Sequence, residues 1–187
     1  MADRATTLFE ELLAEQAGRS RPPVEQWHPE REGRIDIRIA RDGTWYHEGD
    51  PIRREALVRL FSTILRREGD SHYLVTPVEK LAIEVDVAPF VAVRLERDGE
   101  GADQRLLLTT NVGEHVVIDD AHRLAMVPVG DEVLPLVEVR DGLQALVTRP
   151  VYYELAEYAL ETAEASASGP DVPGVYSSGS YFPLAAP

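Results

Sequence analysis

The sequence predicts an α+β fold made of two small duplicated domains, each an antiparallel sheet with a packed helix. Three observations support this class. Short segments in which apolar and polar residues alternate recur along most of the chain, as in half-buried strands. Two longer segments place apolar residues at helical spacing. The tripeptide Arg-Asp-Gly occurs three times, each time after an alternating strand.

Composition limits the partners of the protein. The chain has 187 residues, 44% of them hydrophobic and 28% charged, which fits one globular domain or two small ones. Its formal net charge of −14 argues against broad binding to nucleic acid or anionic membranes, because both require cationic surfaces. The chain has no cysteine, which excludes disulfides and thiolate chemistry.

Residues 1–30 are predicted to form an N-terminal helix and an extended arm. Leucines share one face of a helix over residues 3–17, and several prolines favour an extended backbone after it. This segment lacks the positive region and apolar core of a secretory signal. No apolar run is long enough to cross a membrane. We therefore expect a cytoplasmic protein.

Residues 31–88 are predicted to form the first domain. Apolar and polar side chains alternate over Ile35–Ile39, which indicates a half-buried strand. Asp42-Gly43 is a hairpin signal because both residues tolerate positive φ, and residues 44–47 would form the returning strand.

An amphipathic helix is predicted after this hairpin. Apolar residues recur at helical spacing from Leu57 to Leu65. Arg66 and Arg67 are expected in the last helical turn, with Gly69 as its C-terminal cap. The remaining strands of this domain are predicted at residues 72–76 and 81–85.

Residues 89–166 are predicted to form the second domain, after a hinge at residues 86–90 where proline interrupts the chain. A final helix begins near Pro150, a residue suited to the first helical position. Residues 167–187 are rich in serine, glycine and proline and are expected to form a flexible or loosely docked tail. Strands are predicted at residues 90–96, 105–109, 115–118, 136–140 and 143–147.

The Arg-Asp-Gly repeat favours duplication of a strand–turn–strand–helix unit. Its three copies end at Gly43, Gly99 and Gly142. The first and third copies share more, since each continues into a strand and then an amphipathic helix. The alternative is that Asp-Gly hairpins simply recur in β-rich proteins.

Standard catalytic signatures are mostly absent. The chain has no phosphate-binding loop, no dinucleotide-binding glycine pattern and no nucleophile elbow. Asp119, Asp120 and His122 could hold a metal ion, but their spacing is better explained by an exposed hairpin turn, so no metal site is predicted.

The segment Thr76–Lys80 is the best candidate for a binding site. It connects two predicted strands, and it contains Lys80, the only lysine among 19 basic residues. A compact ammonium group there could meet a phosphate while Glu79 fixes its orientation. The alternative is a surface ion pair, which would contribute less than about 1 kcal/mol.

Two further candidates lie in the same domain. Arg53 is expected near the start of a helix, where a cation is disfavoured unless an anionic ligand or a neighbouring acid balances it. Trp45 and Tyr46 point to opposite faces of a strand, so at least one belongs to the core and the other could stack on a ligand ring.

Several motifs together resemble the bacterial family called domain of unknown function 1285. They are GTWYHEG, PIRREALVRLFS, LVTPVEK and APF within Ile35–Phe90, followed by Thr109–Gly113, Val139–Leu143 and Arg149–Leu155. The resemblance covers residues 27–158. The chain departs from the family pattern at Val87, where an acidic residue is expected.

The resemblance implies two duplicated α+β domains, the second vaguely similar to a pleckstrin-homology barrel. It also implies a binding site between the domains for a nucleotide-like ligand, and a role in signalling. It identifies no cofactor and no catalytic residue. The residues predicted to line this site are Lys80, Glu79, Arg53, Trp45, Arg149 and Tyr152.

Two other functions remain open at this point. The protein could be an enzyme acting on a nucleotide or a phosphorylated metabolite, with Glu79 and Asp86 as acid–base or metal-binding groups beside Lys80. It could also be an interaction module that recruits a protein partner through its acidic surface or through residues 176–184.

Overall fold

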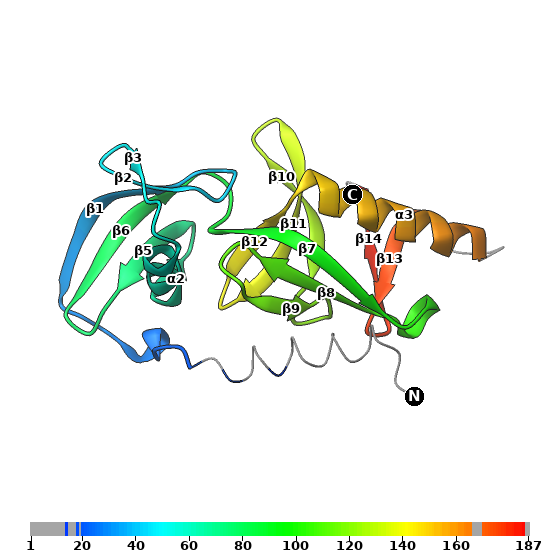
Figure 1. Ribbon diagram of the computed structural model, residues 1–187, viewed down its shortest axis with the longest axis horizontal. Helices are drawn as coiled ribbons and strands as arrows, with labels where there is room; N and C mark the ends of the chain where they lie inside the picture. Colours follow the sequence, from blue (N-terminus) through cyan, green and yellow to red (C-terminus); the bar gives the residue numbers. More distant parts are fainter. Residues whose placement is uncertain (1–13, 15–17, 19, 166–169, 186–187) are drawn as a thin grey trace.

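The computed structural model describes residues 14, 18, 20–165 and 170–185. Two six-stranded sheets lie next to each other along the long axis of the molecule, and a small hairpin packs against the second sheet (Figure 1). The helix expected over residues 3–17 falls almost entirely outside the described residues.

The first domain contains one sheet and one packed helix. Its sheet has the strand order β3-β2-β1-β6-β5-β4. Its elements are η1 (Val24–Gln26), β1 (Arg31–Ile39), β2 (Trp45–His47), β3 (Asp50–Pro51), α2 (Glu55–Thr63), β4 (Leu65–Glu68), β5 (Ser71–Val75) and β6 (Glu79–Val85).

The hairpin predicted at Asp42-Gly43 is confirmed. Ile39 pairs with Trp45 across β1 and β2, and Gly43 has a φ of +86°, which suits a residue without a Cβ atom. The Asp42 carboxylate accepts a hydrogen bond from the Thr44 backbone N–H at 2.9 Å, which fixes the turn.

Helix α2 ends earlier than the sequence indicates. Arg66 and Arg67 lie in strand β4, and Gly69 lies in the β4–β5 turn with a φ of +59°. The helical pattern extends too far because Leu65 is apolar and buried in a strand as it would be in a helix. Arg66 is held in the strand because its guanidinium donates to the Val24 and Trp27 carbonyls of the arm.

The second domain contains the other sheet, one long helix and the added hairpin. Its sheet has the strand order β10-β11-β12-β7-β8-β9. Its elements are β7 (Phe90–Asp98), η2 (Gly101–Asp103), β8 (Arg105–Thr110), β9 (His115–Val117), β10 (Leu124–Val129), β11 (Glu132–Arg140), β12 (Leu143–Val147), α3 (Arg149–Ala165), β13 (Gly174–Ser177) and β14 (Ser180–Pro183). Strands β3, β4 and β10 and the β13–β14 hairpin were not predicted from the sequence.

Both sheets have the same topology. Each sets two antiparallel three-stranded meanders side by side, and the first strand of one meander pairs in parallel with the last strand of the other, β1 with β6 and β7 with β12. The predicted fold class, two duplicated α+β domains, is confirmed. The expected sheets were purely antiparallel, and this detail is wrong, because alternation of side chains does not distinguish parallel from antiparallel pairing.

The shared topology also corrects the register of the repeat. The β1–β2 turn, which contains Gly43, corresponds to the β7–β8 turn, which begins at Gly99. The first Arg-Asp-Gly copy therefore matches the second, whereas the sequence suggested the third. The mistaken match arose because both the first and third copies precede a helix, but α2 follows β3 whereas α3 follows the last strand of its sheet.

The C-terminal segment is also more ordered than expected. The β13–β14 hairpin buries Val175 and Phe182, which are 0% and 1% exposed. Ser177 accepts a hydrogen bond from the Leu106 backbone N–H and donates one to the Ile118 carbonyl. The prediction of a flexible or loosely docked tail is wrong for residues 174–183, because a few apolar side chains among small residues are enough to anchor a hairpin on the core.

Candidate functional site

A cleft lies at the junction of the two domains. Its volume is about 760 Å³, within the usual range for small-molecule sites. The first domain contributes the β1–β2 turn and the end of β6, and the second contributes β10, β11 and the connection from β12 to α3. In Figure 1, the β1–β2 turn reaches toward the second domain near the start of α3.

The wall of the cleft is largely aliphatic and belongs to the second domain. Leu134, Leu146 and Val91 are less than 9% exposed, so only parts of these side chains reach the cleft. Met126 is half-buried. The second domain contributes the apolar lining residues Val91, Met126, Val133, Leu134, Pro135, Leu146 and Val147, and the first domain contributes Ala40.

Two ion pairs frame the cleft. Arg38 forms a bidentate pair with Asp86, with distances of 2.9 Å from Nε to Oδ1 and 2.7 Å from Nη2 to Oδ2. These hydrogen bonds hold the pKa of Asp86 below its usual range. Arg41 pairs with Glu132 and lowers the pKa of that carboxyl group. The second pair connects the first domain to the second across the cleft.

Arg149 and Tyr152 stand at the start of α3, where they line the same cleft. Arg149 is exposed, and no acidic side chain among the described residues lies within ion-pair distance of its guanidinium. The Tyr152 hydroxyl donates to the Leu184 carbonyl at 3.0 Å, which orients the half-buried ring. These are the two predicted site residues that the structure brings together.

The other predicted site residues lie away from the cleft. Trp45 is 1% exposed and stacks on Phe61 in the core of the first domain, with ring centroids 6.2 Å apart. Arg53 is exposed on the segment between β3 and α2. The structure therefore does not bring these two residues together with Arg149.

Glu79 and Lys80 occupy the start of β6, whereas Asp86 follows its end. Lys80 Nζ lies 2.8 Å from Glu32 and 3.0 Å from Glu68, and these carboxylates raise its pKa. Glu79 lies 4.0 Å from Arg31. A strand of this length separates Glu79 from Asp86 by roughly 20 Å, so the two carboxylates do not converge as the enzyme hypothesis requires.

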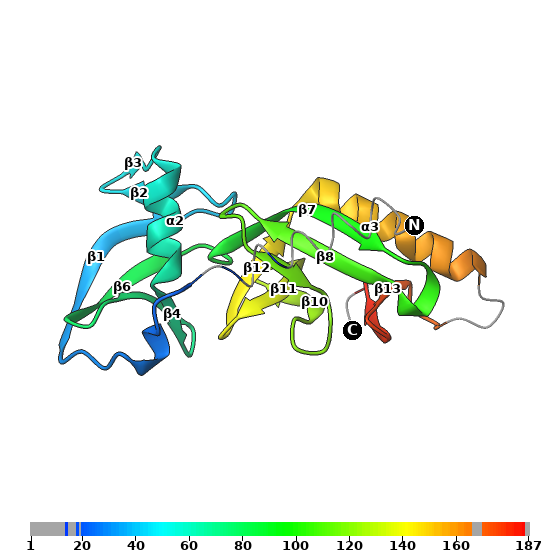
Figure 2. The same ribbon diagram turned by 60° about the horizontal axis from the view of Figure 1, so that its bottom comes forward.

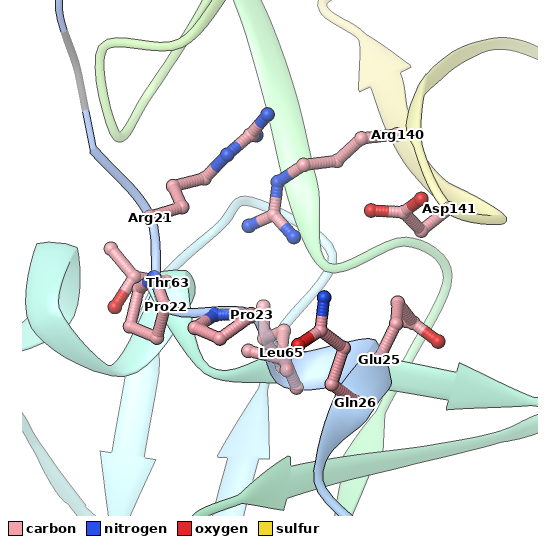
Figure 3. Close-up of a pocket in the computed structure, with 10 residues that line it drawn as sticks. Arg21, Pro22, Pro23, Glu25, Gln26, Thr63, Leu65, Arg140 and Asp141 are labelled. Atoms are coloured by element: carbon pink, nitrogen blue, oxygen red, sulfur yellow. The ribbon is translucent and has the colours of Figure 1, made fainter.

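A second hollow, of about 170 Å³, is lined by residues 21–26 of the arm and by residues of both domains. The arm passes the domain junction on the side away from the β1–β2 turn (Figure 1 and Figure 2). Figure 3 shows Arg21 and Arg140 approaching it from the arm and from the second domain. Arg140 pairs with Glu114 at 3.1 Å, and it also donates to the Ser62 carbonyl at the end of α2. Arg21 reaches the same carboxylate at 2.9 Å.

The Arg21–Glu114–Arg140 cluster connects the arm to the second domain, and its hydrogen bond to Ser62 reaches the first. Sequence reasoning missed it because Arg21 and Glu114 are far apart in the chain. A weak signal existed at Asn111, the only asparagine in the chain. Its side chain accepts a hydrogen bond from the Val91 backbone N–H at 3.0 Å and donates one to the Gly43 carbonyl at 3.4 Å, so it also connects the domains.

The described part of the chain offers neither a metal-ion site nor a membrane-spanning helix. It contains no group of three or more His, Asp or Glu side chains placed to hold a metal ion. His122 and Asp119 form a local pair within a turn. None of the helices described is long and apolar enough to span a membrane.

Known proteins show the same two-part division. The model described as "Domain of unknown function (DUF1285), N-terminal domain" matches residues 22–88, and the corresponding C-terminal domain model matches residues 89–184. No match is found among curated proteins.

Two solved structures are similar. A DUF1285 family protein from Silicibacter pomeroyi DSS-3 is 47% identical, with a TM-score of 0.78, over 92% of this chain and 93% of that one. A DUF1285 family protein from Shewanella baltica OS155 is 26% identical, with a TM-score of 0.51, over 65% of this chain and 90% of that one. From the two domain matches and these likenesses, the chain belongs to the DUF1285 family.

Proposed function

We propose that the protein binds a small organic anion in the cleft between its two domains. The observation that carries this proposal is Arg149, a cation without an acidic partner among the described residues, at the edge of a largely apolar cavity. The other two arginines of the cleft, Arg38 and Arg41, are already neutralised by acids. A ligand anion would give Arg149 the partner that the protein does not supply.

A nucleotide-like ligand is one member of this class, and it is the member that the family resemblance implies. Its phosphate would pair with Arg149 while its ring lay against Tyr152 or a guanidinium plane. Because both domains line the cleft, such a ligand would contact both at once. Binding would then favour one arrangement of the domains over others, which is the physical basis of the signalling role proposed here.

The two rival functions receive less support. The carboxylates required for catalysis, Glu79 and Asp86, lie at opposite ends of β6. Within residues 176–184, the segment proposed to recruit a partner, Phe182 and Leu184 are buried in the main hydrophobic core. A partner would have to displace this hairpin from the core before it could bind these apolar side chains.

A thermal-shift screen against nucleotides, phosphorylated metabolites and organic acids tests the proposal. A ligand present at 100 times its dissociation constant should add about 2.7 kcal/mol to the free energy of unfolding. The substitution Arg149→Gln should weaken binding by roughly 10- to 100-fold, the effect of losing a charged hydrogen bond.

Arg59→Gln is the matched control. Arg59 is an exposed arginine on α2 that pairs only weakly with Glu55, at 3.6 Å, and it does not line the cleft. Binding that is equally strong in wild type and in Arg149→Gln would refute the cleft as the site.

A further inference from the structure

The lining of the cleft indicates which kind of organic anion fits it. Eight of its sixteen lining residues carry aliphatic, thioether or proline side chains, and Tyr152 supplies the only aromatic ring among them. Thr148 and Tyr152 carry the only neutral hydrogen-bonding side chains of the lining. The wall is therefore suited to an apolar body and offers few neutral hydrogen-bonding side chains.

A nucleobase has different requirements. Proteins hold bases by stacking them on aromatic or guanidinium planes and by hydrogen bonding to their edges. Here the Tyr152 hydroxyl is already bonded to Leu184, and the Arg38 and Arg41 guanidiniums are already paired with Asp86 and Glu132. Asp42 accepts the Thr44 backbone N–H within its own turn. The polar edges of a base would therefore lose their water with little in return.

An aliphatic body has no such cost. Burying methylene groups against Val91, Met126, Leu134 and Leu146 is favourable by about 0.8 kcal/mol for each CH₂ group. One unpaired cation, Arg149, stands at the edge of this wall. The lining therefore combines an apolar surface with Arg149, the one of its three arginines that no acid pairs, and an amphipathic anion has the complementary arrangement.

We propose that the ligand of the cleft is an amphipathic anion, a carboxylate or phosphate ester with an aliphatic chain. Its head group pairs with Arg149, and its chain lies along Met126, Leu134 and Leu146. This inference rests on the proposed function and narrows it. The same chemistry occurs in free alkyl anions and in bilayer lipids, and the net charge of −14 favours the free form because anionic bilayers repel the protein.

The test is a calorimetric titration of the full chain with octanoate, decanoate and dodecanoate, each kept below its aggregation concentration, and with AMP. Affinity should rise about fourfold for each added methylene, which corresponds to about 0.8 kcal/mol per CH₂. Arg149→Gln should weaken the binding of all three carboxylates by a similar factor. The gain in affinity for each added methylene should stay unchanged.

Met126→Asn is the second variant, because Met126 is only half-buried and its replacement should leave the fold intact. This variant should reduce the gain in affinity for each added methylene, and the contribution of the head group to the affinity should remain. Arg59→Gln again serves as the control and should bind as wild type does.

Three outcomes would overturn the inference. Arg149-dependent binding of AMP without binding of the carboxylates would refute the aliphatic ligand and keep the proposed function. An affinity independent of chain length would refute the apolar contact. Co-sedimentation with vesicles of phosphatidylcholine and phosphatidic acid, without binding of the monomeric carboxylates, would refute a free ligand in favour of a bilayer.

Discussion

The two domains share one strand order but cover their sheets differently. In the first domain, α2 is inserted between the two meanders, and it brings Phe61 against Trp45. In the second domain a short loop takes that place, and the cover comes from α3 and the β13–β14 hairpin after the last strand. The two domains thus share the sheet, whereas their helices stand at different places in the order of elements.

The difference is visible in the cores. Most of the fully buried apolar side chains belong to the second domain, and the largest buried side chain of the first is Trp45. The first domain also relies on contacts from outside its sheet, since Arg66 binds the arm and Arg67 donates to the Gly142 carbonyl of the second domain. We therefore expect the first domain to be the less stable of the two.

The largest effect should come from Trp45→Ala. Removing a fully buried tryptophan should cost about 3–5 kcal/mol, and the loss should fall on the first domain. Hydrogen exchange should then show β1 and β6 losing protection before β7 and β8. Phe182→Ala, which removes a side chain 1% exposed in the second domain, is the counterpart. Equal loss of protection in both domains for both variants would mean that the domains unfold as one unit.

Glu114→Gln tests how much the Arg21–Glu114–Arg140 cluster stabilises the contact between the domains. The carboxylate lies between Arg140, whose side chain is 9% exposed, and Arg21. Leaving a buried arginine without its partner should cost about 3 kcal/mol, measured by denaturant unfolding. Glu84→Gln breaks an exposed pair with Arg34 and should cost less than about 1 kcal/mol. Similar costs for the two variants would contradict a role for the Arg21–Glu114–Arg140 cluster in joining the domains.

Gly43→Ala should disturb the same interface from the side of the first domain. A Cβ atom there would lie 2.7 Å from both Asn111 Nδ2 and Val91 Cγ2, at a φ of +86°. Strain and overlap together should cost about 2–3 kcal/mol. Gly69→Ala shares the positive φ, but its Cβ would meet nothing within 4 Å, so it should cost about 1 kcal/mol. The difference between the two losses of unfolding free energy measures the overlap at the interdomain contact, together with the greater backbone strain at a φ of +86° than at +59°.

The smallest effect concerns pH. Burial lowers the pKa of His72 in strand β5 from 6.5 to about 4, with a smaller contribution from Arg67. The unfolded chain therefore binds a proton near pH 6.5 that the folded chain takes up only near pH 4. The stability contributed by neutral His72 is complete above pH 6.5 and is lost as the pH falls toward 4.

Because His72 keeps some contact with water, this loss should amount to roughly 1–2 kcal/mol. The free energy of unfolding should be measured between pH 7 and pH 4 in wild type and in His72→Gln. The variant should lose the part of the slope of this free energy against pH that His72 contributes. An unaltered slope in His72→Gln would exclude His72 as its source.

Local signals in the sequence predicted much of the fold. Asp42-Gly43 specified its hairpin, and the apolar spacing located α2. The same pattern failed at Arg66, because Leu65 fits a helix and a buried strand equally well. It also failed at β10, which contains Pro128 and has no clear alternation.

The candidate site was predictable only in part. Arg149 and Tyr152 were found because they begin a helix and lie within a recognisable motif. The wall of the cleft was not found, because Val91, Met126 and Leu146 come from three different strands and meet only after the sheet has formed. The spacing of these residues along the chain does not indicate that they line one cleft.

The parallel pair at the centre of each sheet has a consequence for synthesis. Strand β1 has no lasting partner on one side until β6 exists, so the first domain remains incomplete until residue 85 has left the ribosome. At about 5–20 residues per second, the interval after β1 lasts roughly 2–9 s. During that time an edge rich in isoleucine stays open to wrong pairing. The second domain repeats this delay with β7 and β12, so a nascent chain passes twice through a stage at which a chaperone would be useful.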